Sequence, residues 1–298
     1  MPFQEHPEGA EARLRRRIER LRNDRLSGSS LIADRTLAAL AACARGAWQP
    51  GSSRLLRSQA RALARTHPAM ALPEAVANAL DRALSEVRTL PLNERGRKVA
   101  AALQDTRRLF AQARTEVAER AAQELTGYLP FLLLSYSGSV VAACTAMRRQ
   151  RRVVPVVVCE SRPKREGRIL ARRLADAGCR VTLIIDAAMG KWITQCGAVL
   201  LGCDRADRNG FVNKIGSQAL SLLAENAGRP VYVLVDRFRI SERTVGPADL
   251  PLYDPADLIS GRDRRITVDN PYFEHTRWRA VHRVVTEDGI IAAPDFAA

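Results

Sequence analysis

A polar segment punctuated by glycine, residues 202–217, separates an apolar run from a stretch with helical spacing. It carries a carboxylate at Asp204, turns through residues 209–210, and presents Asn213 and Lys214 at a predicted helix start. An acid, an amide and a compact ammonium near one point suit a phosphorylated polyol. Three roles are open for Asp204: proton transfer, acceptance of a hydrogen bond from a sugar hydroxyl, and capping of a helix. For Lys214 the alternative is a solvated lysine.

Further polar clusters follow other apolar runs of the sequence. Arg162 offers a guanidinium fork for phosphate, with a structural ion pair to Glu160 as the alternative. Ser137 and Ser139 flank a glycine before a predicted helix, which favours a small phosphate cradle or an ordinary helix cap. The clusters comprise residues 135–139, 160–167, 186–188, 202–217 and 236–239. We expect all of them to meet in one crevice.

These clusters must be positioned by the elements that precede them. Short apolar runs rich in β-branched residues predict strands at residues 131–135, 153–159, 181–186, 198–201 and 231–236. Helical patterns between them occupy residues 140–149, 167–177, 188–196 and 216–227. This alternation predicts a Rossmann-like, doubly wound parallel sheet over residues 126–298, with ligands bound beyond the strands' carboxyl ends.

Residues 1–125 show a different pattern, without strand-like runs. Apolar residues spaced by three and four predict a helical N-terminal domain of four to six helices, including residues 31–44, 56–64, 73–87 and 99–121. Gly28 and Ser29 precede one helix, and His67 precedes a proline. We interpret these three residues as substrate contacts that close over the crevice; a helix cap and a turn are the alternatives.

Composition narrows the function classes. The chain of 298 residues has six scattered cysteines without a close pair and only four histidines, so we expect no metal, cofactor or disulfide framework. No apolar run reaches the ~20 residues of a membrane helix, and we expect a cytosolic (cytoplasmic) protein. The formal charge of +15 comes from arginines dispersed along the chain, which favours solvated helix faces over a nucleic-acid groove.

The motifs in combination resemble one family. It joins the regulatory subunits of initiation factor two-B to ribose-1,5-bisphosphate isomerase and methylthioribose-1-phosphate isomerase. The resemblance rests on residues 159–163, 166–168, 202–204, 209–210 and 213–216, with 270–274 and 286–290 similar to the family's C-terminus and 28–30 and 67–68 placed where its N-terminal signatures fall. It covers about residues 20–292.

The resemblance implies two catalytic residues. Asp204 matches the catalytic aspartate of the isomerases, whereas their catalytic cysteine aligns with Ser137. A hydroxyl ionises far less readily than a thiol, whose ordinary pKa is about 8.5, so cysteine-dependent chemistry is in question. Cys203 and Cys144 are the alternative candidates for the missing catalytic thiol. Glu166 also departs from the methylthioribose branch, which usually shows glutamine there.

The resemblance therefore implies an aldose–ketose isomerase acting on a C1-phosphorylated pentose. In it, Arg162, Ser139 and Lys214 bind phosphates and hydroxyls, and Asp204 transfers the proton. The alternative is a non-catalytic regulatory protein, similar to initiation factor two-B, that binds a sugar phosphate or a nucleotide. Self-association into dimers or larger rings is implied by the family in either case.

Overall fold

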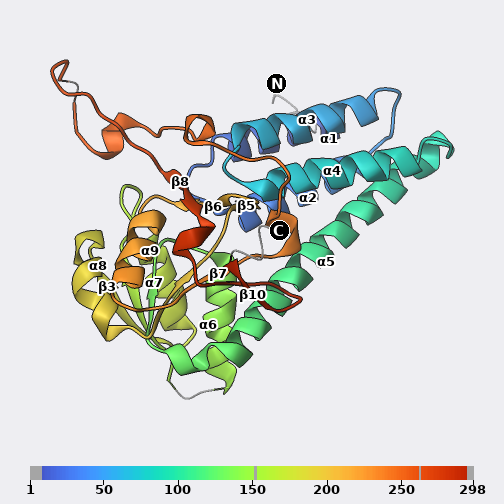
Figure 1. Cartoon of the computed structure of the whole chain (residues 1–298). Helices are drawn as coiled ribbons and strands as arrows, with labels where there is room; N and C mark the ends of the chain where they lie inside the picture. The colour runs from blue at the N-terminus through green and yellow to red at the C-terminus, as the bar shows by residue number, and fades with distance from the viewer. Residues whose placement is uncertain (1–8, 151–152, 262, 294–298) are drawn as a thin grey trace, which may run out of the picture. The chain divides into compact units, whose positions relative to one another are not determined.

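The computed structural model describes residues 9–150, 153–261 and 263–293 (Figure 1). The chain divides into two compact units, Met1–Ala111 and Gln112–Ala298, which are described separately below. The long helix α5 (Leu92–Glu124) contributes residues to both units. The domain boundary predicted at residue 125 stays a prediction.

The first unit is helical in its described part, as the spacing of apolar residues predicts. It contains the start of α5 and four complete helices: α1 (Ala10–Arg22), α2 (Ser29–Ala44), α3 (Ser52–Thr66) and α4 (Ala71–Glu86). In α3, Leu56, Ala60 and Leu63 recur at intervals of four and three and are all buried. Burial of one such leucine side chain stabilises the fold by ~1.5–3 kcal/mol.

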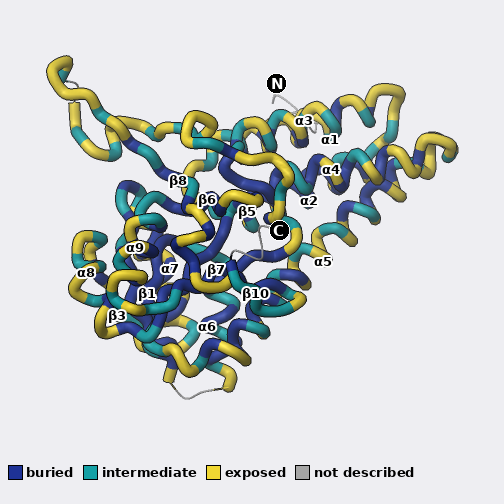
Figure 2. Tube along the Cα trace, viewed as in Figure 1, coloured by how far each residue is buried: buried dark blue, intermediate teal, exposed yellow. Residues whose placement is uncertain are grey.

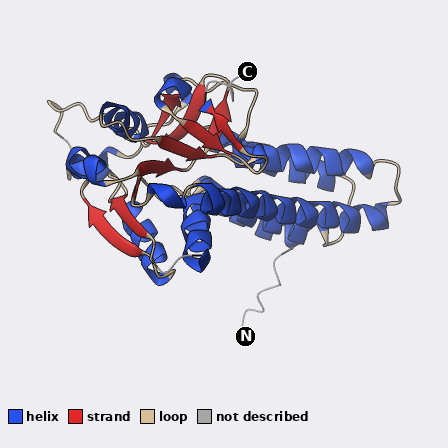
Figure 3. Ribbon diagram, turned by 60° about the horizontal axis from the view of Figure 1, so that its bottom comes forward, coloured by secondary structure: helices blue, strands red, loops and turns tan. Residues whose placement is uncertain are grey.

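The second unit contains a seven-stranded sheet with helices on both faces (Figure 3). The strands run in the order β10-β9-β7-β4-β1-β2-β3, all parallel to their neighbours except the edge strand β10. Their bounds are β1 (Phe131–Leu133), β2 (Pro155–Cys159), β3 (Arg180–Ile184), β4 (Ala198–Leu201), β7 (Val231–Leu234), β9 (Arg283–Val285) and β10 (Ile290–Ala292). This confirms the predicted Rossmann-like sheet.

Alternate strand residues serve two separate cores. Phe131 and Leu133 pack in one core with α6 (Gly138–Gln150), α7 (Gly167–Asp176) and the end of α5, whereas Leu132 packs in another with α9 (Ser217–Asn226). Because side chains alternate across a strand, a strand buried on both faces is apolar throughout. This is why the predicted strands read as continuous apolar runs.

Two elements differ from the sequence prediction. Residues 202–217 are not a loop leading to a helix: they contain the hairpin β5 (Arg205–Asp207) and β6 (Gly210–Lys214), which pairs with β8 (Phe273–Arg277) in a separate antiparallel sheet. The Asp207 carboxylate accepts the amides of Asn209 and Gly210, which stabilises the turn. An Asn-Gly pair is a recognised sequence signal for a hairpin. The polar composition of the segment led to the prediction of a loop instead.

Asn213 and Lys214 therefore end a strand, and the prediction that they begin a helix is wrong: α9 begins at Ser217. The predicted helix at 188–196 is also wrong as a continuous element. It is a short α8 (Met189–Trp192) between two 3₁₀ turns, η2 (Asp186–Ala188) and η3 (Ile193–Gln195).

The predicted ligand contacts of the first unit lie at helix ends. Gly28 precedes α2, and its carbonyl accepts the amides of Leu31 and Ile32, while Ser29 is the buried first residue of the helix. His67 follows α3, is buried, and its Nε2 lies 2.9 Å from the Leu21 carbonyl oxygen. Their part in ligand binding stays a prediction.

The buried position of His67 predicts a pH-dependent stability. Burial lowers the pKa of its imidazole from the usual 6.5. Below about pH 6.5 the unfolded chain binds a proton that the folded chain resists, so stability falls as pH drops. His67→Gln should flatten the slope of Tm between pH 7 and 5.5, whereas His282→Gln, at an exposed position, should keep it. Equal slopes in all three proteins would contradict the prediction.

Candidate functional site

The carboxyl ends of the parallel strands form a polar rim. In the sheet, β2 and β3 lie on one side of β1, and β4 and β7, which follow later in the chain, lie on the other side. The strand order thus reverses between β1 and β4, and in open α/β sheets ligands bind at this switch point. Ser137 follows β1 there, and Asp204 follows β4.

Ser137 lies directly against the loop that carries Asp204. A Cβ atom placed on Gly202 would come within 2.3 Å of Ser137 Oγ, so only glycine fits beside this hydroxyl. Ser137 Oγ also accepts a long hydrogen bond, 3.4 Å, from the Val140 amide in the first turn of α6. The Asp204 amide donates to the Val212 carbonyl at 2.9 Å, and its side chain is partly exposed. The hydroxyl and the acid therefore belong to adjoining loops.

The loops after β1, β2 and β3 are joined by hydrogen bonds. The Ser135 amide donates to Ser161 Oγ at 2.8 Å, and the amides of Ser161 and Arg162 donate to the two Asp186 carboxylate oxygens at 2.8 and 2.7 Å. Ser135 and Ser161 have φ values of 64° and 67°, which cost energy for residues with a side chain. These bonds hold the strained backbone and join three of the five predicted clusters; that all five line one crevice stays a prediction.

Arg162 does not pair with Glu160, so that alternative is wrong. Glu160 instead binds Arg168 at 2.7 Å, because the helical turn after residue 167 brings Arg168 back over it. Arg162 Nη2 donates to the main-chain oxygen of Asp257 at 3.1 Å, and the neighbouring Lys164 pairs with the Asp257 carboxylate at 2.6 Å. Two cations of one loop thus face one acidic residue.

Lys214 is buried, not a solvated helix-start lysine. Only 2% of its side chain is exposed, and Nζ lies 2.5 Å from Glu166 Oε1 and 3.6 Å from the centroid of the Tyr272 ring. Burial lowers the pKa of Lys214, while the Glu166 carboxylate opposes that change. Glu166 Oε1 also accepts a 3.0 Å hydrogen bond from Ser135 Oγ. The buried pair is therefore linked directly to the loop after β1.

The other two predicted contacts are also buried. Ser139 is the second residue of α6, close to the switch point in sequence. Asn213 Nδ2 donates to Ser217 Oγ at 2.9 Å, and Ser217 Oγ donates to the Lys214 carbonyl, which stabilises the start of α9. Contact of Ser139 or Asn213 with a ligand stays a prediction.

A second buried ion pair supports the loop after β4. Arg239 Nε lies 2.8 Å from Asp236 Oδ2, and Nη1 donates to the Cys203 carbonyl at 2.7 Å. Cys203 itself is buried, and burial raises the pKa of its thiol well above the usual value. Burial does the same for Cys144. Both thiols stay protonated near neutrality, so neither suits the part of an exposed catalytic thiolate.

Sequence reasoning missed several residues of the rim as site candidates. Glu166, Asp186 and Arg239 lay inside the clusters that follow the strands, and their position was the available signal. Tyr272 lies far along the chain, and the antiparallel pairing of β6 with β8 is what brings its neighbourhood to Lys214. Among the described residues, no group of three or more His, Cys, Asp and Glu side chains is arranged to hold a metal ion.

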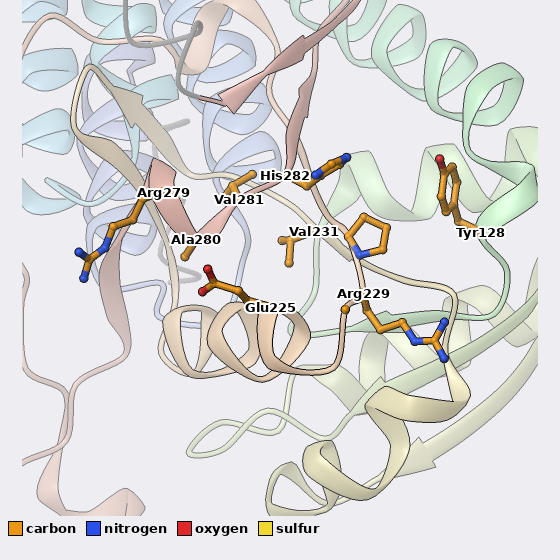
Figure 4. A pocket seen from close by; sticks show the side chains of 10 residues that line it. Tyr128, Glu225, Arg229, Val231, Arg279, Ala280, Val281 and His282 are labelled. Carbon is orange, nitrogen blue, oxygen red and sulfur yellow. The ribbon is translucent and has the colours of Figure 1, made fainter.

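A pocket lies away from this rim (Figure 4). It has a volume of about 380 Å³ and is lined by residues that include Tyr128, Arg229, Val231 and His282. Val231 begins β7 and Tyr128 precedes β1, so the pocket lies at the amino ends of the strands. Ligands of parallel sheets bind at the opposite edge, and we therefore place the candidate site at the rim.

The seven-stranded, mostly parallel sheet with helices on both faces defines a Rossmann-like α/β class. The sequence model of the Initiation factor 2 subunit family matches residues 25–293, and the chain belongs to that family. No helix in the described part of the chain is long and apolar enough to cross a membrane.

Two relatives match over most of both chains. The chain is 30% identical to the ribose 1,5-bisphosphate isomerase of Haloterrigena turkmenica, over 89% of this chain and 85% of that protein. It is 27% identical to the enzyme of the same name from Haloferax volcanii, over 95% and 88%.

Solved structures share the fold. The translation initiation factor eIF-2B of Pyrococcus horikoshii OT3 superposes with a TM-score of 0.81 at 24% identity, over 96% of this chain and 99% of that one. The 5-methylthioribose 1-phosphate isomerase of the same organism gives 0.80 at 21%, over 95% and 85%. At these identities the structures support the architecture alone.

Proposed function

We propose that the chain is an aldose–ketose isomerase acting on a C1-phosphorylated pentose, similar to ribose 1,5-bisphosphate isomerase. The observation that carries the proposal is the hydroxyl of Ser137 beside the Asp204 loop at the switch point. The two relatives that match over most of their length bear the name of that enzyme. The pattern of arginine and lysine on the rim supports an anionic substrate.

The chemistry requires an acid. A phosphate on the anomeric oxygen blocks simple hemiacetal opening, so the ring oxygen must accept a proton as the C1–O bond to it breaks. Loss of the C2 proton then gives an enol, and return of a proton to C1 as the C2 oxygen gives up its own leaves the ketose. Protons are only moved, so no external oxidant or reductant enters the reaction.

Asp204 is the residue suited to the first proton transfer. Its side chain is partly exposed at the switch point, where a sugar ring can approach it. By the family resemblance Ser137 aligns with the catalytic cysteine of the isomerases, and a neutral hydroxyl donates a hydrogen bond to a sugar oxygen more readily than it exchanges a proton. We therefore assign proton transfer to Asp204 and substrate orientation to Ser137.

The test is a direct assay. Purified protein is incubated with ribose 1,5-bisphosphate, with and without a nucleotide activator, and ribulose 1,5-bisphosphate is followed by phosphorus NMR. Appearance of the ketose at a rate proportional to protein concentration supports the proposal. Its absence under both conditions rejects it.

A non-catalytic binding protein is the second candidate, favoured by the serine at position 137, which by the family resemblance aligns with the catalytic cysteine of the isomerases. In this case sugar phosphates or nucleotides raise Tm through preferential binding to the folded chain, without turnover. Conversion of substrate that disappears in Asp204→Asn rejects this candidate.

Substitution of Gly202 should damage the site more than the fold. In Gly202→Ala the new Cβ would lie 2.3 Å from Ser137 Oγ and 2.6 Å from Ser137 Cβ, so the loop must shift. Overpacking costs ~1–3 kcal/mol, whereas a displacement of about 1 Å in a site can lower kcat roughly 100-fold. Gly190→Ala, where nothing lies within 4 Å of the new Cβ, is the control. Equal kcat in the two variants would contradict this placement of Ser137.

We also propose that the chain self-associates. A chain of the tetrameric eIF2B-beta2-delta2 complex of C. thermophilum has the same fold, with a TM-score of 0.69 at 15% identity. Light scattering coupled to gel filtration measures the mass directly, and a single 32.8 kDa species across the concentration range would reject self-association.

A further inference from the structure

The chain between β7 and β8 contains a long irregular segment, residues 241–271, called the strap below. In its described residues, 241–261 and 263–271, the regular structure is limited to two short 3₁₀ turns, η5 (Pro247–Asp249) and η6 (Pro255–Asp257), and an isolated antiparallel bridge between Leu252 and Pro271. It is drawn in orange in Figure 1, and much of its outer part is exposed in Figure 2. Leu258 and Ile266 in this part are 46% and 50% exposed. The strap therefore has few apolar contacts to hold its outer part.

The strap is bonded to the hairpin at its start and to itself further on. The Ser241 amide donates to the Ala206 carbonyl at 2.8 Å, and the Tyr253 amide donates to the Asn270 carbonyl, also in the strap, at 2.9 Å. Tyr253 stacks on Tyr272 with ring centroids 4.4 Å apart. Because Tyr272 also carries the Lys214 ammonium on its ring, the base of the strap adjoins the buried pair of the candidate site.

One strap residue reaches the cations of the rim. Asp257 presents two oxygens: its main-chain oxygen accepts from Arg162 Nη2 at 3.1 Å, and its Oδ1 lies 2.6 Å from Lys164 Nζ. Its Oδ2 lies 3.5 Å from Asn270 Nδ2 of the strap. The side chains of Lys164 and Asp257 are 24% and 17% exposed, so water screens this pair only partly.

The main-chain oxygen and the carboxylate of Asp257 each face a cation, and two oxygens of one phosphate would take their places. A guanidinium and an ammonium at the carboxyl ends of parallel strands are suited to a phosphate dianion. The Asp257 carboxylate also favours the charged form of Lys214, and thus raises the pKa that burial lowers. The negative charge of Asp257 therefore acts both on the cations of the rim and on the buried pair of Lys214 and Glu166.

We propose that Asp257 occupies a phosphate subsite, formed by Arg162 and Lys164, in the ligand-free protein. A phosphate monoester enters this subsite by displacing Asp257, and the strap then leaves the rim. For the identity of the monoester, a sugar phosphate, the inference rests on the proposed function; the competition between Asp257 and phosphate does not. The strap thus makes affinity for the ligand lower than the two cations alone would give.

Calorimetric titration with inorganic phosphate tests the competition without any turnover. Asp257→Asn should bind phosphate about five- to tenfold more tightly than the wild type, because the competing charge is gone. The matched control is Asp263→Asn, which removes the same charge from the strap but from a carboxylate paired with the exposed Arg265. Equal affinity of wild type and Asp257→Asn, an equal gain in the control, or no phosphate binding by either overturns the proposal.

Two further measurements guard against a misfolded variant. Lys164→Met introduced into Asp257→Asn should abolish the gain in affinity, because it removes half of the subsite. In the wild type, saturating phosphate should speed amide hydrogen exchange at residues 255–259 as Asp257 is released. Slower or unchanged exchange with phosphate bound overturns the proposal. A protein that binds phosphate in this way yet converts no ribose 1,5-bisphosphate would refute the isomerase and leave the subsite standing.

Discussion

Replacing Asp204 with asparagine is expected to lower kcat for the conversion of ribose 1,5-bisphosphate roughly 10²- to 10⁴-fold, the usual contribution of a general acid–base group. The amide keeps the shape of the side chain but has no proton to give to the ring oxygen. The amide of Asp204 that donates to the Val212 carbonyl belongs to the backbone and is kept.

The assay needs a control for the loss of one carboxylate and a separate measure of binding. Asp176→Asn changes the same group at the exposed end of α7 and should keep the wild-type kcat. Substrate affinity of Asp204→Asn, measured by calorimetry, should change much less than kcat, because the phosphate contacts are intact. A fall in affinity as large as the fall in kcat would make Asp204 a binding residue instead.

The architecture of the second unit was predictable from sequence because parallel strands buried on both faces leave a strong signal. Residues 198–201 were predicted as a strand and form β4 with the same bounds, and helix 167–177 is α7 to within one residue. The strands that were missed pair outside the alternating pattern of strands and helices: β6 pairs with β8, about 60 residues further on, and β9 pairs with β7, about 50 residues before it. Apart from the Asn-Gly turn between β5 and β6, nothing local to these segments reports their pairing.

The site was predictable in its location but not in its charges. The position of Asp204 beyond a strand placed it at the switch point, as it does Ser137. The pairing of Lys214 with Glu166 joins residues 48 positions apart, one at the end of β6 and the other in the turn before α7, and no local pattern marks it. Proteins bury a lysine only with a partner, so burial and pairing had to be seen together.

That buried pair gives the second large prediction, a loss of stability in Lys214→Met. Removal of the ammonium leaves the Glu166 carboxylate buried, with 3% of its side chain exposed and with only the neutral hydroxyls of Ser135 and Tyr272 beside it. Breaking a buried ion pair by removing one partner costs ~3–5 kcal/mol. Urea unfolding should show that the free energy of unfolding of Lys214→Met is lower than that of the wild type by this amount. The control Lys191→Met, at an exposed position, should change it little.

The double variant Lys214→Met/Glu166→Gln separates the charge from the packing. If the uncompensated carboxylate causes the loss, the neutral amide restores much of the free energy of unfolding, since a buried pair replaced by neutral groups is often nearly neutral in stability. The glutamine amide oxygen can still accept from Ser135, which keeps the loop before Ser137 in place. A double variant no more stable than Lys214→Met would mean that the ammonium acts through its contact with the Tyr272 ring instead, because that contact is absent from both variants.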